Sequence, residues 1–245
     1  MNPALLHIAE AVILHIPHAS TVLPQSVEFL LGDEDLAHEV NAMTDHNTHQ
    51  LFELFKAQRV VFPVSRLVVD PERFIEDPME SVGMGVVYTK TSSGEPLRNI
   101  SSVQRQRLID QYYHPHHHQL TTATRLALST YGRCLIVDCH SFPAQPLPYE
   151  VDQSRPDICI GTDLFHTPPE LTAHIVTKFE GLGYTVAVNS PFAGTLVPMD
   201  YYQKDSRVQS VMVELNRKLY DTPLKLNNLK VHVKLVLKGL VRVQH

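Results

Sequence analysis

Short apolar runs rich in β-branched residues alternate along the chain with longer stretches in which apolar residues recur at helical spacing. The short runs predict strands at 11–16, 59–64, 65–69, 86–88, 135–141, 158–161, 184–188 and 208–215. The longer stretches predict helices within 32–57, at 170–182 and at 226–240. A further helix is predicted from a capping box at Ser101 and Gln104 to about residue 113, with a second stretch that continues to 130. This alternation favours an α/β fold, with one domain over residues 1–245 and a mixed, mainly parallel twisted sheet flanked by helices.

Three polar or irregular segments interrupt this pattern. The cluster 44–49 lies on the predicted helical stretch within 32–57 or in a break within it, and 75–96 is an irregular excursion of the kind that often covers a site. Pro115 is expected to kink the helix around residue 113. The histidine-rich tract 114–118 lies at that kink, so its members should point in different directions, most of them into solvent, with one left to face a site.

Composition narrows the class of ligand. The chain has 245 residues, a net charge of −5 and no dense Lys/Arg block before its C-terminal segment, so nothing favours binding to nucleic acid or membranes, and small soluble ligands are expected. Its three cysteines fit reduced thiols and a cytoplasmic location. No window approaches the ~18 apolar residues of a membrane helix. The 15 histidines exceed what packing requires and prompt a search for metal ligands.

The segment 135–141 is the most informative of the predicted strands. Its apolar run ends in Asp138, Cys139, His140 and Ser141, which is typical of a buried strand that delivers polar groups to a site. Because side chains alternate along a strand, Asp138 and His140 should share one face, while Cys139 points into the core on the other. An acid and an imidazole on one face suggest an enzyme.

Two histidines are expected at the carboxyl ends of strands, His18 after the first and His140 after the strand at 135–141. Together with Asp45 they form the set of two imidazoles and a carboxylate that is typical of a hydrolytic zinc ion. His46 or His49 could supply the third ligand instead of Asp45. The simpler alternative is that His18 caps a strand and Asp45 caps a helix.

Glu214 is an acid inside an apolar strand, on the same face as Met212 and Asn216. It is a candidate general base, and its alternative role is an internal ion pair with Arg217.

Arg66, Asp70 and Arg73 follow or end a predicted strand. An arginine donates two parallel hydrogen bonds to a carboxylate, so these arginines are candidates for binding a substrate carboxylate, with ordinary surface pairing as the alternative.

Eight short blocks in register give the chain a resemblance to a known family. They are 16–20 (IPHAS), Asp45, 65–70 (SRLVVD), 112–117 (YYHPHH), 137–141 (VDCHS), 155–157 (RPD), 189–194 (NSPFAG) and 213–217 (VELNR). In these blocks the sequence resembles the N-formylglutamate amidohydrolases over most of its length. The resemblance implies a zinc-peptidase (phosphorylase/hydrolase-like) architecture and an enzyme of histidine catabolism that releases formate and glutamate from N-formyl-L-glutamate.

The resemblance also implies roles for particular residues. His18, Asp45 and His140 would hold one zinc ion, and Glu214 would be the base and proton shuttle. By position, the substrate carboxylates would be bound by Arg66, Arg73 and Arg155, and the carbonyl oxygen would be polarised by His117 or Asn189.

The sequence departs from the family pattern at three places. Thr21 stands where the related peptidases have a ligating carboxylate, Glu72 occupies a position where Asn is common, and Thr195 replaces a frequent Gly. The alternatives are therefore a deacylase or carboxypeptidase-like hydrolase acting on another N-acyl amino acid, and a non-catalytic relative that binds a metal or ligand. The sequence leaves the oligomeric state open.

Overall fold

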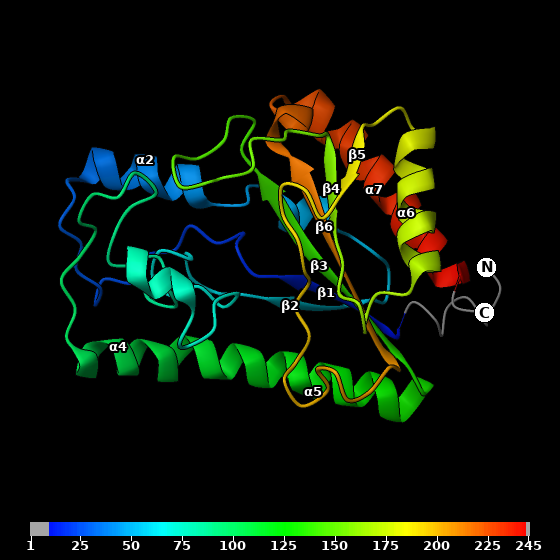
Figure 1. Cartoon of the computed structure of the whole chain (residues 1–245), viewed down its shortest axis with the longest axis horizontal. Helices are drawn as coiled ribbons and strands as arrows, with labels where there is room; N and C mark the ends of the chain where they lie inside the picture. The colour runs from blue at the N-terminus through cyan, green and yellow to red at the C-terminus, as the bar shows by residue number, and fades with distance from the viewer. Residues whose placement is uncertain (1–9, 244–245) are drawn as a thin grey trace.

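Six strands form one sheet in the computed structural model, which describes residues 10–243 (Figure 1). The strands are β1 (Val12–Ile16), β2 (Gln58–Val61), β3 (Cys134–Phe142), β4 (Ile158–Gly161), β5 (Val186–Val188) and β6 (Val208–Asn216). Their order is β2-β1-β3-β6-β4-β5. The first four are parallel, β4 is antiparallel to β6, and β5 is parallel to β4. The predicted α/β fold with a mixed, mainly parallel sheet is confirmed.

Helices cover both faces of this sheet. They are α2 (Asp33–Met43), α3 (Thr48–Leu51), α4 (Ser102–Leu108), α5 (His114–Tyr131), α6 (Pro169–Gly181) and α7 (Pro223–Val243). Single helical turns lie at η1 (Pro78–Val82), η2 (Ile109–Tyr113) and η3 (Arg217–Tyr220). In Figure 1, α4 and α5 run end to end along one side of the sheet, and α6 and α7 lie on the other. Within the described residues, no helix is long and apolar enough to cross a bilayer.

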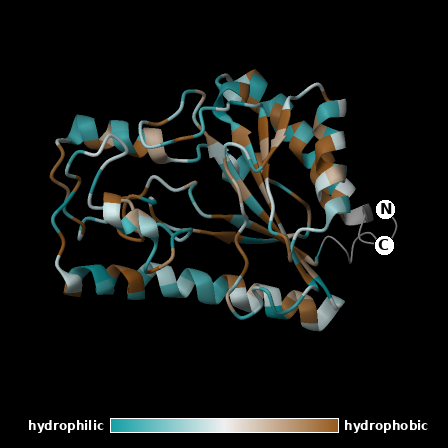
Figure 2. Ribbon diagram, viewed as in Figure 1, coloured by the Kyte–Doolittle hydropathy of each residue, from teal (hydrophilic) through white to brown (hydrophobic). Residues whose placement is uncertain are grey.

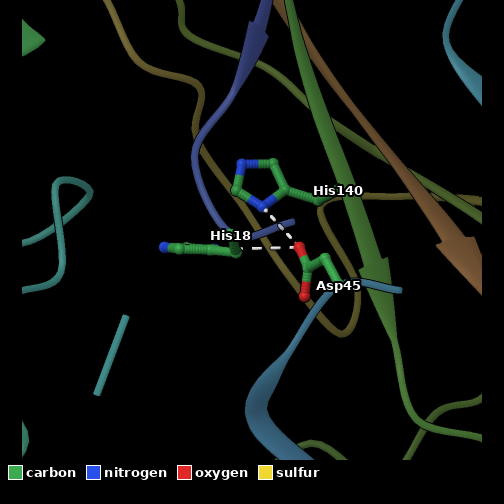
Figure 3. Close-up of side chains that lie close together, drawn as sticks. All are labelled: His18, Asp45 and His140. Carbon is green, nitrogen blue, oxygen red and sulfur yellow. Dashed lines mark hydrogen bonds and ion pairs between the residues drawn. The ribbon is translucent and has the colours of Figure 1, made fainter. Parts of the chain in front are cut away.

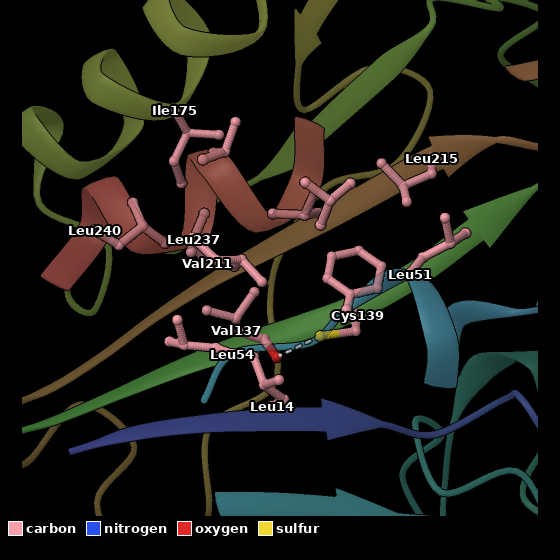
Figure 4. Packing of buried hydrophobic residues seen from close by; sticks show 14 of the residues in the cluster. Leu14, Leu51, Leu54, Val137, Cys139, Ile175, Val211, Leu215, Leu237 and Leu240 are labelled. Carbon is pink, nitrogen blue, oxygen red and sulfur yellow. Dashed lines mark hydrogen bonds between the residues drawn. The ribbon is translucent and has the colours of Figure 1, made fainter. Parts of the chain in front are cut away.

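Strand alternation divides the core between the two faces. Leu14, Val137 and Cys139 belong to the cluster that packs against α3, α6 and α7 (Figure 4). Ile13 and Ile136 belong to the cluster on the α5 side. Each fully buried aliphatic side chain of this kind contributes about 1.5–3 kcal/mol, and Figure 2 shows apolar residues concentrated on the central strands. Cys139 is a core residue, as predicted, which leaves Asp138 and His140 on the opposite face.

Two predicted strands, 65–69 and 86–88, are absent from the described structure. The chain leaves the sheet after β2, and residues 65–69 form a turn in which the amide of Val68 donates to the carbonyl of Ser65 at 2.9 Å. The amide of Asp70 then donates to the carbonyl of Val86 at 2.8 Å. The valines of both runs are buried in a separate cluster beside η2, and Leu67 and Tyr88 are buried in another cluster. The two runs are therefore buried as predicted, but they do not form strands.

Pro115 does not break its helix. The π-turn η2 precedes it, so α4 and α5 form one continuous rod. A proline ring clashes with the carbonyl four residues earlier, and residue 111 lies within this wider turn, which accommodates the ring. The capping box is confirmed, because Ser101 and Gln104 exchange side-chain to backbone hydrogen bonds at the start of α4.

The polar cluster 44–49 is a break between two helices. α2 ends at Met43 and α3 begins at Thr48, with Asn47 in the left-handed region at φ 62°. The amide of Asp45 donates to the carbonyl of His18 at 2.9 Å, which fastens this break to the end of β1. The break therefore presents the Asp45 carboxylate at the carboxyl edge of the sheet.

Candidate active site

His18, Asp45 and His140 converge at the carboxyl ends of β1 and β3 (Figure 3). Oδ2 of Asp45 lies 3.1 Å from Nδ1 of His140 and 3.7 Å from Nδ1 of His18. The amide of Ser141 donates to the same oxygen at 3.1 Å. All three side chains are buried. The structure thus brings together the three residues that the sequence suggested as metal ligands.

The outer nitrogens of the two imidazoles are each held by a further carboxylate. Nε2 of His18 donates to Asp70 at 2.8 Å, and Nε2 of His140 donates to Asp138 at 3.1 Å. These bonds leave Nδ1 of both rings directed toward Asp45, and Nδ1 of His18 is buried without a hydrogen-bond partner among residues 10–243. Metal-binding histidines are commonly oriented in this way by a carboxylate. Two imidazoles and a carboxylate fit a divalent metal such as zinc.

Charge and burial have opposite effects on the pKa values of the candidate ligands. Burial acts to raise the pKa of Asp45, but the hydrogen bond with His140 and the nearby imidazole of His18 outweigh it and hold that pKa below its usual value. Burial acts to lower the pKa of His140, but the negative charge of Asp138 raises that pKa well above its usual value. In the metal-free protein His140 therefore holds a second ring proton, which must leave before Nδ1 can bind a cation.

The other two candidates for a third ligand lie elsewhere. Nε2 of His46 hydrogen bonds with the carbonyl of Asn41 at 2.9 Å. His49 is exposed, and its carbonyl accepts a hydrogen bond from Arg59. Of the three alternatives left open by the sequence, Asp45 is the one that lies with His18 and His140.

A cavity of about 400 Å³ opens over these residues. Its charged lining comprises His18, Asp45, Arg66, Glu72, Arg73, His140, Glu150, Glu214 and Arg217. Phe142, Phe192, Met212 and Tyr149 add apolar surface. A small anionic molecule placed here would touch the candidate metal ligands and several guanidinium groups at once.

Glu214 projects into this cavity from β6, opposite His140 in the strand register. The alternation of β6 places Val213 and Leu215 in the core cluster on the α7 side, as predicted. Oε2 of Glu214 is buried and has no hydrogen-bond partner in the described part of the chain. Burial raises the pKa of Glu214 to about 8. A carboxyl group with such a pKa can take up and release a proton near neutral pH.

Of the residues predicted to bind the substrate, Arg66 and Arg73 line the cavity, and Arg155 and Asn189 do not. Arg66 donates to Asp70 at 2.7 Å, and Nε of Arg73 lies 3.9 Å from the same carboxylate. Arg155 instead pairs with Glu150. Asn189 is exposed, and its amide group hydrogen bonds with Thr162. Neither Arg155 nor Asn189 is among the described residues that line the cavity.

His117 lines a neighbouring cavity of about 530 Å³, and Glu72 and Arg73 border both cavities. Nε2 of His117 hydrogen bonds with the carbonyl of Pro71 at 3.0 Å. Burial lowers the pKa of His117 to about 4, so the ring is neutral at pH 7 and donates this bond. His117 thus holds the segment that presents Glu72 and Arg73.

Sequence reasoning missed two residues that shape the site, His15 and Tyr88, and named a third, Arg217, only as a possible ion-pair partner of Glu214. His15 lies on the α5 face of β1, and its Nδ1 bonds with Asp138 at 2.8 Å. The hydroxyl of Tyr88 donates to Asp70 at 2.7 Å. Arg217 is held by the carbonyl of Ala42 at 2.8 Å and lines the cavity. Strand alternation was a usable signal for His15, whereas Tyr88 belongs to the irregular excursion and offered none.

Comparisons with known proteins agree with this geometry. Residues 10–221 match the family model described as N-formylglutamate amidohydrolase. The chain is 26% identical over 221 residues to the N-formylglutamate deformylase of Pseudomonas putida, a match that covers 85% of this chain and 80% of that protein.

Two solved structures share the fold. The N-formylglutamate amidohydrolase of Ralstonia eutropha JMP134 matches with a TM-score of 0.81 at 20% identity, over 95% of this chain and 93% of that one. The gene product Atu2144 of Agrobacterium tumefaciens matches with a TM-score of 0.73 at 22% identity, over 96% and 93%. At these identities the structural likeness concerns the fold alone.

Proposed function

Because the chain belongs to the N-formylglutamate amidohydrolase family, we propose that it hydrolyses the amide of N-formyl-L-glutamate to formate and L-glutamate with one zinc ion. The observation that carries this proposal is that His18 and Glu214 line the same cavity and that each has an atom without a partner among the described residues. Each has a buried side-chain atom, Nδ1 and Oε2 respectively, that lacks a hydrogen-bond partner within residues 10–243. Atoms left unpaired in this way are suited to a metal, a water molecule and a substrate.

His18, Asp45 and His140 would hold the zinc ion. When bound, the ion would acidify a water molecule and polarise the substrate carbonyl. Glu214 accepts the proton of the attacking water and passes it to the leaving nitrogen. Asp70 and Asp138 keep the two imidazoles in the required tautomer throughout.

Arg66 and Arg73 bind the substrate carboxylates in this proposal. Asp70 orients the guanidinium of Arg66. Nε of Arg73 is buried with no hydrogen bond to any described residue, which leaves it available to a ligand. His117 positions the segment that contains Arg73, because it hydrogen bonds with the carbonyl of Pro71. Arg155 does not contact the substrate in this proposal; it holds Glu150, which lines the cavity.

The experiment that tests the substrate is a panel of N-formyl, N-acetyl and N-carbamoyl amino acids offered to the zinc-loaded protein, with the released amino acid measured. We expect N-formyl-L-glutamate to give the highest kcat/KM. A preference for another acyl group or amino acid would replace the named substrate and keep amide hydrolysis. Bound zinc without turnover of any compound would favour a non-catalytic relative.

We also propose a cytoplasmic location and a role in histidine catabolism. The three cysteines are buried and unpaired, which fits a reducing compartment. Glutamate and formate are the products that the proposed reaction would supply. Deleting the gene should impair growth of the host on histidine as nitrogen source, and unimpaired growth would remove this role.

A further inference from the structure

A second cluster of ligand-type atoms lies behind His140, on the side of its ring opposite Asp45. Oδ1 of Asp138 accepts hydrogen bonds from Nε2 of His140 at 3.1 Å and from Nδ1 of His15 at 2.8 Å. Oε1 of Glu72 lies 3.3 Å from Nδ1 of His15 and 4.0 Å from Nε2 of His140. β1, β3 and the loop after Asp70 therefore bring an imidazole and two carboxylates to one point.

Nδ1 of His15 and Oε1 of Glu72 lie 3.3 Å apart, which is the spacing of two ligands on one cation, whereas a hydrogen bond draws Nδ1 of His15 and Oδ1 of Asp138 to 2.8 Å. Zinc binds nitrogen and carboxylate oxygen at about 2.0–2.2 Å, so the ligand atoms of a tetrahedral site lie about 3.3–3.6 Å apart. The ligand atoms of His15, Glu72 and Asp138 all lie within 4.8 Å of one another. His15 and Asp138 are fully buried, so these groups are not ordinary solvated side chains on the surface.

The charge of the cluster also favours a bound cation. Oε1 of Glu72 is buried and accepts no hydrogen bond from the residues that the structure describes. It lies close to Asp138, a second buried carboxylate. Asp138 is already paired with His15 and His140, so within the described residues the atom that lacks compensation is Oε1 of Glu72, and a carboxylate oxygen removed from water without a partner needs a proton or a cation.

We propose that His15, Glu72 and Asp138 form a second site for a divalent cation of the zinc type. Nδ1 of His15, Oε1 of Glu72 and Oδ1 of Asp138 would be the ligand atoms, and Nδ1 of His15 would release to solvent the proton that it donates to Asp138. Glu72 borders both cavities, so a remaining coordination position faces space that a small molecule can enter.

The second site is coupled to the first through Asp138. Its Oδ1 would bind the second cation while accepting the Nε2 proton of His140, which belongs to the first site. A cation on this oxygen draws electron density away from that hydrogen bond, and His140 becomes a weaker base. Filling the second site should therefore weaken zinc binding at the first.

The test is the zinc content of the full chain after chelator treatment and equilibration at fixed free zinc concentrations. We expect two equivalents for the wild-type protein. Glu72→Gln should lose one equivalent, and so should His18→Asn, which removes the first site. Glu76→Gln is the matched control on an exposed glutamate of the same loop, and it should keep two.

Two results would overturn the second site. One is saturation of the wild-type protein at a single equivalent. The other is a second equivalent that survives both Glu72→Gln and His15→Gln, since that zinc would be on surface histidines such as those at 114 and 118. Far-ultraviolet circular dichroism identifies variants that fail to fold, and the wild-type count does not depend on them.

Turnover of N-formyl-L-glutamate separates this proposal from the proposed function. A protein that holds one zinc and hydrolyses the substrate has the proposed activity and lacks the second site. A protein that holds two zinc ions, loses one in Glu72→Gln and hydrolyses nothing has the second site and lacks the activity.

Discussion

Nε2 of His18 donates a hydrogen bond to Oδ1 of Asp70 at 2.8 Å, and both side chains are buried. This bond fixes which nitrogen of His18 holds the proton and turns Nδ1 toward Asp45. Asp70 is itself held by Arg66 and Tyr88, so the orientation of the imidazole is determined by a network rather than by a single contact.

Asp70→Asn should weaken zinc binding by about 10- to 100-fold, the usual effect of removing a carboxylate that orients a ligating histidine. Competition with a chromophoric chelator measures the affinity. Asp221→Asn is the control, because Asp221 is an exposed aspartate paired with Lys225. Equal zinc affinity in Asp70→Asn and the control would mean that Asp70 does not orient a ligand.

Glu214→Gln should retain zinc and lose at least ~10²-fold in kcat, the usual contribution of a positioned general base. Glutamine keeps the size of the side chain and cannot accept the proton. Steady-state kinetics and metal content, measured on the same preparation, check both halves of this prediction. Undiminished kcat with bound zinc would remove Glu214 from the reaction.

The raised pKa of Glu214 should make metal-free protein less stable as the pH rises. Its pKa is about 8 in the folded chain against an ordinary value of 4.5. Between these pH values the native state holds a proton that the unfolded chain has lost, so this contribution to stability declines as the pH rises through the window. Denaturant unfolding of wild-type protein and Glu214→Gln from pH 4.5 to 8.5 isolates the effect, because the variant stays neutral. A stability difference that does not change with pH would contradict the raised pKa.

Arg73→Met should lower kcat/KM for N-formyl-L-glutamate by roughly tenfold or more, since a hydrogen bond to a charged group contributes about 1.5–3 kcal/mol. Arg155→Met is the matched control. Its guanidinium pairs with Glu150, so we expect KM near that of the wild-type protein. A larger loss in Arg155→Met than in Arg73→Met would reverse the assignment of the carboxylate-binding arginines.

Hydrophobic periodicity predicted the strands and helices that pair or pack in the regular way. It failed at 65–69 and 86–88, where apolar runs are buried in turns. Periodicity reports burial, and a buried run forms a strand only where a neighbouring backbone offers a ladder of hydrogen bonds. After β2 the chain leaves the sheet, so that ladder is missing for both segments.

In the site, too, residues at strand ends could be predicted and residues in irregular segments could not. His18, His140 and Glu214 could be identified because strand ends of a parallel sheet meet at one edge. Asp45 could be named as a candidate and could not be ranked above His46 and His49, because the fold of a break between helices depends on tertiary contacts such as the bond to the His18 carbonyl. The contact between Glu72 and His15 joins an irregular loop to β1, and no local pattern predicts it.

We propose that the protein hydrolyses N-formyl-L-glutamate with a metal held by His18, Asp45 and His140. The most direct test is the rate of glutamate release by the purified protein before chelator treatment, after it, and after zinc is added back. We expect glutamate release to fall to background with chelator and to return with zinc. Release that continues at full rate in metal-free protein would contradict the metal, and no release from zinc-loaded protein would contradict the substrate.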